Sequence, residues 1–500
     1  MTNRKHKLGA SKQLDIISTS AGEMLSSHNY KTEYTICAIS TPAGVGGIAV
    51  IRVSGNDAFE ICDKIFISNN DGKIADFKPN TIHYGKIAES YSNLSLRDDR
   101  YIDEVLLSVF AAPHSFTGEN TVEISCHGSA FIQQEIVKLL IENGCQLAHP
   151  GEFTQRAFLN GKMDLSQAEA VADLIASQSA AAHRMALNQM RGGFSNELKI
   201  LRQQLLDFVS LVELELDFSQ EDIEFVDRKK LIDLSNDIEL KLNKLTDSFQ
   251  VGNALKNGIP VALVGETNVG KSTLLNLLLN EEKAIVSEIH GTTRDVIEDC
   301  VNIQGVTFRF IDTAGIRQTA DKIENLGIER SFEQIEKASI VLWLVDGTNV
   351  SEHIEWLTEK IFERAKGKKI ILIFNKIDKL SVEELEILEH LFSPFDCEKI
   401  KISAKKRLNT ELLQQLLLKT AQIPHISQTD VIVSNIRHYQ ALKNAQTAIC
   451  RVIEGLKSNI SNEFLTHDIC QCMHFLGEIT GEISSAEVLE NIFSKFCIGK

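Results

Sequence analysis

Short apolar runs and longer helical stripes divide the chain into regions of different pattern. Between residues 34 and 152, four β-like runs alternate with helical segments such as Ala130–Asn143. The runs are Thr35–Ile39, Ile48–Val53, Glu104–Phe110 and Thr121–Ser125. Apolar residues that alternate over about four to eight positions are typical of strands, and those that recur every third or fourth position are typical of helices. The pattern therefore predicts a compact α+β domain over residues 34–152.

The region that follows is helical in pattern almost throughout. Two apolar stripes at helical spacing are formed by Leu165, Ala168, Val171, Ala172 and Ile175, and by Leu198, Leu201, Leu205, Phe208, Leu211 and Val212. Helical patterns return after Pro424 and continue to Ile492. We therefore predict a discontinuous helical domain, made of residues 153–257 and 423–500, with another domain inserted into it.

The inserted segment, residues 258–422, alternates strand-like runs with helical segments. The run Val261–Val264 opens it, and Phe308–Ile311, Ile340–Val345 and Ile370–Phe374 follow. Such alternation predicts a doubly wound α/β domain. The predicted fold class is therefore multidomain, with an α+β part, a helical part and an inserted α/β part.

Composition and charge narrow the class of protein. Of the 500 residues, 43% are hydrophobic and 24% are charged, which is ordinary for a soluble protein with a sizeable core. The strongest apolar run, Ile340–Val345, is far shorter than the about 20 residues that a membrane-spanning helix needs, so an integral membrane protein is excluded. The net charge of −16 argues against binding of nucleic acid by bulk attraction, so an RNA role requires a local basic patch or a partner.

The first residues and the cysteines bear on location. Residues 1–33 are polar, include Asp15 and Glu23, and lack the apolar core of a secretory signal, so we treat them as a leader of unknown role. The 10 cysteines are scattered, and none of them forms a C-x-x-C pair. In a chain of this size the pattern favours reduced thiols and a cytoplasmic location.

A phosphate-binding pattern opens the inserted segment. Gly265-Glu-Thr-Asn-Val-Gly-Lys271-Ser272 has the form G-x-x-x-x-G-K-S and lies between an apolar run and a helical segment. In that setting, backbone N–H groups and a helix N-terminus can surround phosphate oxygens. We expect Lys271 to contact the β- and γ-phosphates and Ser272 to bind Mg²⁺.

Three further motifs follow in order. Asp312-Thr-Ala-Gly315 can hold the Mg²⁺ shell and face the γ-phosphate, whereas Asp378 of Asn375-Lys-Ile-Asp378 can accept both N1–H and the 2-amino group of guanine. Ser403-Ala404 suits a backbone contact with guanine O6. The four motifs together predict a Ras-like P-loop GTPase domain. The residues that they assign to GTP are Gly265, Asn268, Val269, Gly270, Lys271, Ser272, Thr273, Asp312, Thr313, Ala314, Gly315, Asn375, Lys376, Asp378, Ser403 and Ala404.

Two positions depart from ordinary signalling GTPases. Ile316 stands where those enzymes place a glutamine, and its apolar side chain cannot orient the attacking water, so another group must do so. Asn268 in the phosphate-binding pattern allows two interpretations. It is either a solvated polar residue of a loop or a ligand of a monovalent cation beside the phosphates.

Motifs inside and outside the inserted segment together resemble the MnmE/TrmE family of bacterial tRNA modification GTPases. They include Asn268, Gly-Thr-Thr-Arg-Asp at 291–295, Thr-Pro-Ala-Gly-Val-Gly-Gly-Ile at 41–48, Pro-Gly-Glu-Phe-Thr at 150–154 and Phe-Cys-Ile-Gly-Lys at 496–500. The resemblance covers about residues 34–500. It implies an N-terminal folate-binding domain that dimerises, a helical domain and an inserted GTPase domain.

The resemblance also implies a GTPase that is activated by K⁺ and by transient pairing of two GTPase domains. K⁺ would be held by Asn268, Ser287, Ile289 and Thr292, and Mg²⁺ by Ser272 and Thr293. Glu288, His290 and Gly291 would add contacts to GTP. Glu324 would position the attacking water and act in catalysis beside Lys271 and Asn268. The alternative for Glu324 is an exposed carboxylate at a helix start.

A second implied site takes a tetrahydrofolate derivative in its 5-formyl or 5,10-methylene form. Its contacts would be Arg52, Glu123, Lys162 and Lys500. Without the resemblance, Arg52 and Glu123 would be interpreted as solvated strand residues. For Cys497, a catalytic role and a structural role near the folate remain equally open.

The resemblance implies a tRNA-modifying activity with a FAD-containing partner of the MnmG/GidA type. A homodimer within a heterotetramer would add an aminomethyl or carboxymethylaminomethyl group to C5 of the tRNA wobble uridine, with the folate as one-carbon source. Two alternatives stay open: a ribosome-assembly or regulatory GTPase without this chemistry, and an interaction protein with a degenerate nucleotide pocket. A folate titration would separate the first, and a turnover assay on a Lys271 variant the second.

Overall fold

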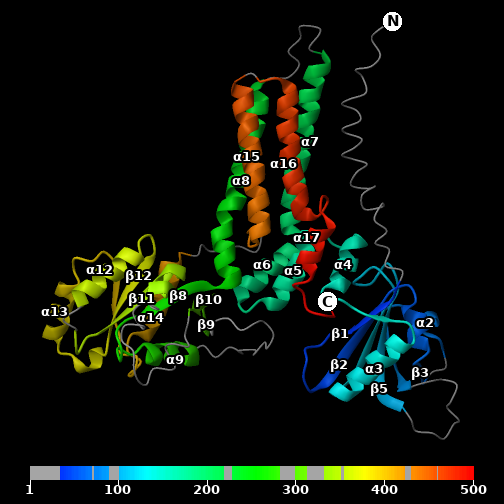
Figure 1. Ribbon diagram of the computed structural model, residues 1–500, viewed down its shortest axis with the longest axis horizontal. Helices are drawn as coiled ribbons and strands as arrows, with labels where there is room; N and C mark the ends of the chain where they lie inside the picture. The colour runs from blue at the N-terminus through cyan, green and yellow to red at the C-terminus, as the bar shows by residue number, and fades with distance from the viewer. Residues whose placement is uncertain are drawn as a thin grey trace. The chain divides into compact units, whose positions relative to one another are not determined.

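The chain forms two compact units, and Figure 1 shows the ribbon of the computed structural model. The structure describes residues 34–69, 72–88, 101–218, 228–281, 299–311, 332–350, 354–422, 430–458 and 460–499. One unit consists of Met1–Ala172, Gln189–Ile238 and Asn444–Lys500, and the other of Asp173–Asn188 and Glu239–Lys443. The domain boundaries expected from the sequence stay a prediction.

The first unit contains a seven-stranded sheet. Its strands are β1 (Ile36–Ile39), β2 (Gly46–Ser54), β3 (Phe66–Ser68), β4 (Thr81–Ala88), β5 (Tyr101–Phe110), β6 (Thr121–Gly128) and β7 (Gln146–Leu147). They lie in the order β3-β4-β5-β6-β2-β1-β7, and all neighbours are antiparallel except β1 and β7. The register between β2 and β6 places Arg52 opposite Glu123.

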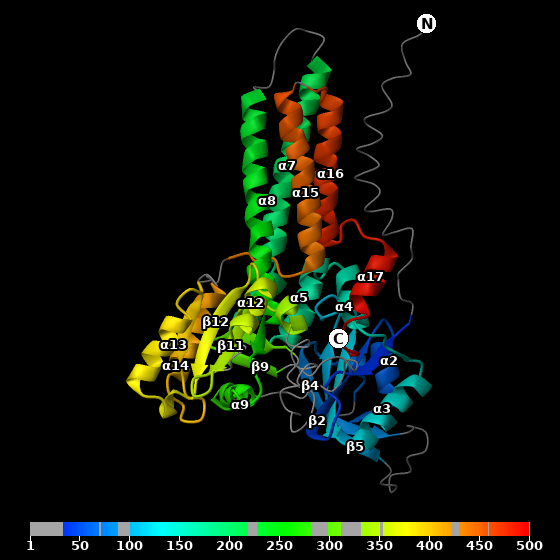
Figure 2. The ribbon, with the colours of Figure 1, turned by 60° about the vertical axis from the view of Figure 1, so that its left-hand side comes forward.

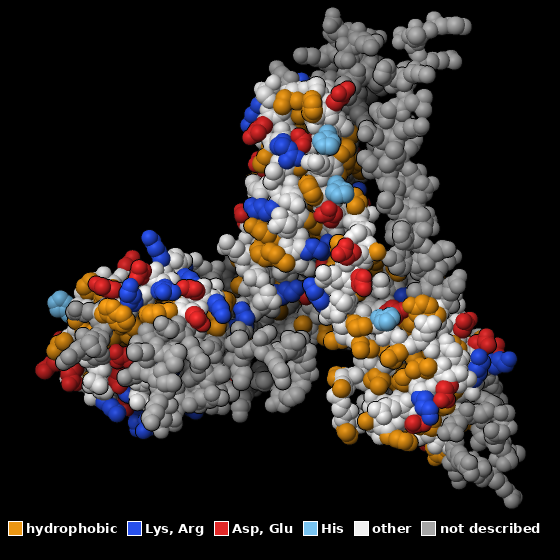
Figure 3. Space-filling view, in the orientation of Figure 1, with side chains coloured by type: hydrophobic (Ala, Val, Ile, Leu, Met, Phe, Trp, Pro, Cys, Tyr) orange, Lys and Arg blue, Asp and Glu red, His pale blue; other side chains and the backbone are white. Residues whose placement is uncertain are grey.

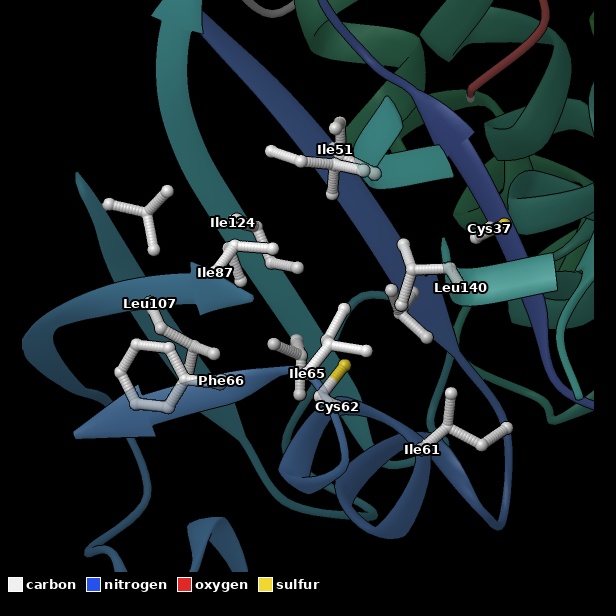
Figure 4. Packing of buried hydrophobic residues seen from close by; sticks show 14 of the residues in the cluster. Cys37, Ile51, Ile61, Cys62, Ile65, Phe66, Ile87, Leu107, Ile124 and Leu140 are labelled. Atoms are coloured by element: carbon white, nitrogen blue, oxygen red, sulfur yellow. The ribbon is translucent and has the colours of Figure 1, made fainter. Parts of the chain in front are cut away.

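Helices cover one face of this sheet and enclose its core (Figure 4). α2 (Ala58–Asp63) and α3 (Ala130–Glu142) contribute Ile61 and Leu140, which pack with Ile51 of β2 and Leu107 of β5. The strand pattern of the sequence predicted β1, β2, β5 and β6. It did not predict α2, β3, β4 or the short 3₁₀ helix Ile74–Asp76.

The segments before and after the second sheet, which is described below, are mostly helical. Their helices are α4 (Glu152–Leu159), α5 (Leu165–Ala176), α6 (Ala180–Met190), α7 (Gly193–Phe218), α8 (Arg228–Asn257), α15 (Ile436–Lys457), α16 (Asn462–Thr480) and α17 (Ala486–Phe493). α7 runs beside α16 in both ribbon views (Figure 2). In the expected apolar stripe of α7, Leu211 is exposed, and the other members are buried: Leu198, Leu201, Leu205, Phe208 and Val212.

The second unit contains a six-stranded, mostly parallel sheet. Its strands are β8 (Ile259–Val264), β9 (Asp299–Ile303), β10 (Val306–Phe310), β11 (Ile340–Asp346), β12 (Lys369–Asn375) and β13 (Glu398–Lys401). The order is β13-β12-β11-β8-β10-β9, with only β9 antiparallel to its neighbour. After β8 the chain continues to β10 on one side and then to β11 on the other. The carboxyl end of β8 is therefore a topological switch point, where open α/β sheets bind ligands.

Helices cover both faces of this second sheet, as the doubly wound prediction requires. α9 (Lys271–Glu281) and α14 (Thr410–Ala421) share a core with Val261 and Leu263 of β8. α12 (Ile354–Arg364) and α13 (Val382–Leu391) pack on the other face with Ala262 and Val264. A 3₁₀ helix, Ile377–Lys379, follows β12. The predicted multidomain fold class is confirmed.

Apolar side chains also lie on the surface of the first unit, where they gather over β1, β2 and α3 (Figure 3). A shallow groove there is lined by Ile39, Gln134, Val137, Lys138, Ile141 and Glu142. Within the part of the chain that the structure describes, no helix combines the length and the apolar character needed to cross a membrane.

Candidate functional site

The residues 265–272, called here the phosphate loop, connect β8 to α9 at the switch point. Lys271 begins α9, and its Nζ donates hydrogen bonds to the carbonyl oxygens of Gly265 (2.8 Å) and Glu266 (2.7 Å). The ammonium thus lies inside the curl of the loop. Burial lowers the pKa of Lys271 below its ordinary value. A partly desolvated cation of this kind interacts with phosphate more strongly than one in water.

Two glycines shape the phosphate loop. Gly265 has φ +152°, and a Cβ there would lie 2.4 Å from the carbonyl oxygen of Leu344. Gly270 has φ +104°, and a Cβ there would lie 2.3 Å from Nδ2 of Asn375. Both positions therefore need glycine for backbone conformation and for space.

The base loop, residues 375–378, is joined to the phosphate loop by side chains. Asn375 is 2% exposed, and its Nδ2 donates to the carbonyl oxygen of Val269 (2.7 Å) while its Oδ1 accepts from the backbone N–H of Ala404 (3.0 Å). One amide group thus connects three segments that the sequence assigned to one nucleotide. Buried amides bonded on both sides hold loops in a single arrangement.

Asp378, the expected guanine ligand, is exposed and oriented by a buried residue. The hydroxyl of Ser403 donates to its Oδ1 (2.6 Å), and this hydrogen bond lowers the pKa of Asp378 below its usual range. The same hydroxyl accepts from the backbone N–H of Lys406 (3.2 Å). A carboxylate that is held ionised and accessible suits recognition of two neighbouring N–H donors.

Sequence reasoning missed a carboxylate beside the base loop. Asp346 ends β11, and its Oδ2 accepts from Nζ of Lys376 at 2.5 Å. The same ammonium donates to the carbonyl oxygen of Asn268 at 2.9 Å. The sequence could have indicated Asp346, because it follows the apolar run of a buried parallel strand. Asn375 has the corresponding position on the neighbouring strand β12.

Several expected site residues lie outside the described residues. They are Ser287, Glu288, Ile289, His290, Gly291, Thr292, Thr293, Asp312, Thr313, Ala314, Gly315, Glu324 and Lys500. The described members of the nucleotide site, from Gly265 to Thr273 and from Asn375 to Ala404, come together at the carboxyl edge of one sheet. Their assigned roles stay predictions.

The expected folate contacts of the first unit form a second cluster. Nε of Arg52 lies 2.9 Å and Nη2 lies 2.8 Å from Oε1 of Glu123. The Arg52 guanidinium also lies 5.5 Å from the ring centroids of Phe116 and Phe153. Among the described residues, Oε2 of Glu123 has no protein donor, so it can accept from a ligand.

Lys162 lies at the loop that carries Phe116. Its Nζ donates to the carbonyl oxygen of Pro113 (2.9 Å), and its side chain lies 3.4 Å from where a Cβ on Gly118 would be. The structure therefore places Lys162 and Arg52 against the same loop, residues 113–118.

A buried ionic network holds this loop in place. Arg156, which is 1% exposed, pairs with Glu152 (2.9 Å) and Glu119 (3.1 Å), and Glu119 also accepts from the hydroxyl of Ser54 (2.8 Å). Tyr34 donates to Glu152 (3.2 Å). These contacts join α4 to β2 and to the loop. Apart from the Arg156–Glu152 pair within α4, the partners are far apart in the chain, so no local pattern predicts that they meet.

The C-terminal tail returns to the same cluster. The carbonyl oxygen of Gly499 accepts from Ser40 Oγ (3.1 Å) and from Arg52 Nη1 (3.5 Å). Gly499 has φ +89°, and a Cβ there would lie 2.3 Å from the carbonyl oxygen of Ile39. Cys497 is exposed, and its carbonyl oxygen accepts from the backbone N–H of Gly151 at 3.4 Å.

The oxygen donors of the phosphate loop fit hard cations. The Ser272 side chain is exposed at the start of α9, and Asn268 is exposed with φ +60°, a strained value for a non-glycine residue. Across the described ranges, no group of three or more His, Cys, Asp or Glu side chains is arranged to hold a metal ion.

Comparison with known proteins gives matches over most of the chain. A model of the MnmE helical domain matches residues 165–497, and a model of the N-terminus of the GTP-binding protein TrmE matches residues 35–162. The tRNA modification GTPase MnmE of Bacteroides thetaiotaomicron is 56% identical over 470 residues, which are 93% of this chain and 99% of that protein. MnmE of Parabacteroides distasonis is 57% identical over 468 residues, which are 93% of this chain and 100% of that protein.

A solved structure also matches part of this chain. It is Era in complex with MgGDPNP and nucleotides 1506–1542 of 16S ribosomal RNA, with 29% identity over 38% of this chain and 65% of that chain. The TM-score of 0.26 supports no argument about a shared function.

Proposed function

Because the chain belongs to the MnmE family of tRNA modification GTPases, we propose that it hydrolyses GTP and acts in the modification of tRNA. The observation that carries this proposal is the connection of the phosphate loop, the base loop and Ala404 through Asn375. In a degenerate nucleotide pocket, nothing would require the two loops and Ala404 to be held together in this way. The family membership disfavours a ribosome-assembly GTPase.

The phosphate loop would bind the nucleotide through its backbone N–H groups and the N-terminus of α9. Lys271 would exchange its bonds to the carbonyls of Gly265 and Glu266 for bonds to the β- and γ-phosphates. Asp378 would accept from guanine, and Ala404 would donate from its backbone N–H to the guanine O6. Electrostatic stabilisation by such fixed groups is the main source of rate in phosphoryl transfer.

The finer GTPase properties are proposed from the family resemblance. Ser272 with Thr293 would hold Mg²⁺, and Asn268 with Ser287, Ile289 and Thr292 would hold K⁺. When bound, K⁺ would offset the charge that develops on the transferred phosphoryl group. Glu324 would orient the attacking water in place of the glutamine that Ile316 replaces.

The first unit would bind a tetrahydrofolate derivative at the cluster of Arg52, Glu123 and Lys162, with Lys500. Oε2 of Glu123 accepts from no described residue, which supports recognition of an N–H edge of the ligand, and the side chains of Arg52 and Lys162 suit folate carboxylates. The folate would supply the one-carbon unit for a group on C5 of the tRNA wobble uridine. Cys497 lies two residues before Gly499, whose carbonyl oxygen contacts Arg52. A catalytic role and a structural role near the folate both stay open for it.

The proposed assembly follows from the same resemblance. We expect a cytoplasmic homodimer that joins a FAD-containing MnmG/GidA-type partner in a heterotetramer. We also expect three domains: a folate-binding domain over residues 34–152, a helical domain over 153–257 and 423–500, and a GTPase domain over 258–422. Light scattering of the purified chain, with and without the partner, tests the assembly.

The function is tested by mass analysis of wobble nucleosides in tRNA from cells that lack the protein, together with GTP turnover by the purified chain. We expect loss of the C5 modification, and restoration by the wild-type chain but not by a Lys271→Ala variant. If the amount of the modified wobble nucleoside were the same with and without the protein, a role in tRNA modification would be contradicted. Turnover that is independent of K⁺ would contradict the cation site.

A further inference from the structure

A carboxylate outside the four GTPase motifs is connected to both nucleotide loops. Asp346 lies at the end of β11, directly opposite Asn375 in the register between β11 and β12. The phosphate loop follows β8, which is the other neighbour of β11. Asp346 thus lies at the same edge of the sheet as both loops, although it belongs to neither.

The contacts of Asp346 are divided between its two oxygens. Oδ1 accepts from the backbone N–H of Thr348 (3.0 Å) and from the Thr348 hydroxyl (2.7 Å). Oδ2 accepts from Nζ of Lys376 at 2.5 Å. The Asp346 side chain is 13% exposed and that of Lys376 is 30% exposed, so the charge pair is partly shielded from water. Thr348 therefore fixes the carboxylate, and the carboxylate fixes the lysine.

Lys376 in turn contacts the phosphate loop. Its ammonium donates to the carbonyl oxygen of Asn268 at 2.9 Å. Both residues have positive φ, +65° for Lys376 and +60° for Asn268, and such conformations persist in non-glycine residues only where the surroundings hold them. An ammonium has three N–H donors, and the described residues accept from two of them here.

We propose that Asp346 is a positioning residue of the nucleotide site, which holds Lys376 on the phosphate loop and thereby keeps both loops in the arrangement that binds guanine nucleotides. This inference rests on the proposed GTPase function. Asp346 itself would not touch the nucleotide. Without the carboxylate, the long and flexible lysine would leave the Asn268 carbonyl, and the loops would have to be ordered again on each binding event.

The effect is expected mainly on affinity, because Asp346 acts through Lys376 on the backbone carbonyl of Asn268, whereas the cation would be bound by the Asn268 side chain. Hydrolysis depends on groups around the γ-phosphate, to which Asp346 makes no contact among the described residues. Uniform loss of binding raises Kd and KM without lowering kcat. A purely structural role would instead lower the thermal stability of the nucleotide-free protein.

The test measures binding of GDP with Mg²⁺ to the full-length chain by calorimetry, for wild type, Asp346→Asn, Lys376→Met and the double variant. We expect Asp346→Asn to raise the Kd for GDP about tenfold, with kcat for GTP within about twofold of wild type. Since the aspartate acts through the lysine, the double variant should bind no more weakly than Lys376→Met alone. Glu363→Gln, which removes an exposed carboxylate paired with Lys360 on α12, is the matched control and should change nothing.

Additive effects of the two substitutions, or an unchanged Kd for Asp346→Asn, would overturn the proposal. So would a loss of affinity that merely follows a lower melting temperature without nucleotide. If Asp346→Asn does not fold, Thr348→Val removes one bond to the carboxylate and should raise the Kd about twofold to threefold, and an unchanged Kd there also overturns it. Failure of wild type to bind GDP would instead remove the proposed GTPase function itself.

Discussion

The two candidate sites of this chain are built in different ways. The nucleotide site is assembled from loops that follow neighbouring parallel strands, and each loop carries several of its contacts in consecutive residues. The Arg52 cluster takes single residues from β2, β6 and a loop, and adds the carbonyl oxygen of Gly499 from the far end of the chain. A site of the first kind leaves motifs in the sequence, whereas a site of the second kind becomes visible only after folding.

The largest expected effect separates the two sites by their chemistry. Lys271→Ala removes the cation inside the phosphate loop, and we expect GTP turnover to fall on the order of 10²-fold or more. Binding of 5-formyltetrahydrofolate, measured by calorimetry, should stay within about twofold of wild type because the substitution touches only the second unit. A matching loss of folate binding would mean that the sites are not independent.

The next largest effect is a loss of folding stability, and it is expected beside the Arg52 cluster and not at the nucleotide site. Arg156→Met leaves Glu152 and Glu119 buried without their cation, and we expect a loss of about 3–5 kcal/mol in the free energy of unfolding of the first unit. Hydrogen–deuterium exchange of peptides from the first unit, followed over a range of urea concentrations, measures it. Arg156→Met combined with Glu152→Gln should recover part of the loss. If the single variant were as stable as wild type, the network would not be what holds the loop.

A smaller effect concerns the folate cluster itself. Arg52→Gln keeps a hydrogen-bond donor but removes the charge that pairs with Glu123, and we expect the Kd for 5-formyltetrahydrofolate to rise about tenfold. GTP turnover of the isolated protein should not change. Lys64→Gln, on an exposed residue of the same unit, serves as the control. Equal folate affinity of Arg52→Gln and the control would place the folate elsewhere.

The smallest effect is a pH dependence at the guanine contact. The hydrogen bond from Ser403 lowers the pKa of Asp378, so the ionised carboxylate persists in the folded protein as the pH falls towards its ordinary pKa of 3.8. Ser403→Ala should raise that pKa, and the loss of GDP affinity should then begin at a higher pH. We expect about a twofold weakening at pH 7 and a larger one near pH ~4.5, measured by fluorescence titration. The same pH profile for both proteins would contradict the role of Ser403.

The sequence predicted β8, β10, β11 and β12 of the second sheet, but not β9, because the buried parallel strands are mostly apolar runs. It missed β4, whose Ile82 and Tyr84 are 66% and 48% exposed, so the strand shows no clean alternation of apolar and polar residues. It also missed Asp346 and Arg156, since their partners lie 30 and 37 positions away along the chain. Arg52 and Glu123 were found only through the family resemblance, because nothing in either strand indicates that they face each other.

The glycine at position 270 has a consequence for how this protein can change. A side chain there would occupy the place of the Asn375 amide, which joins the two nucleotide loops. A loop taken from another GTPase therefore fits this protein only if it keeps glycine at position 270 or asparagine at position 375, and the two residues constrain each other.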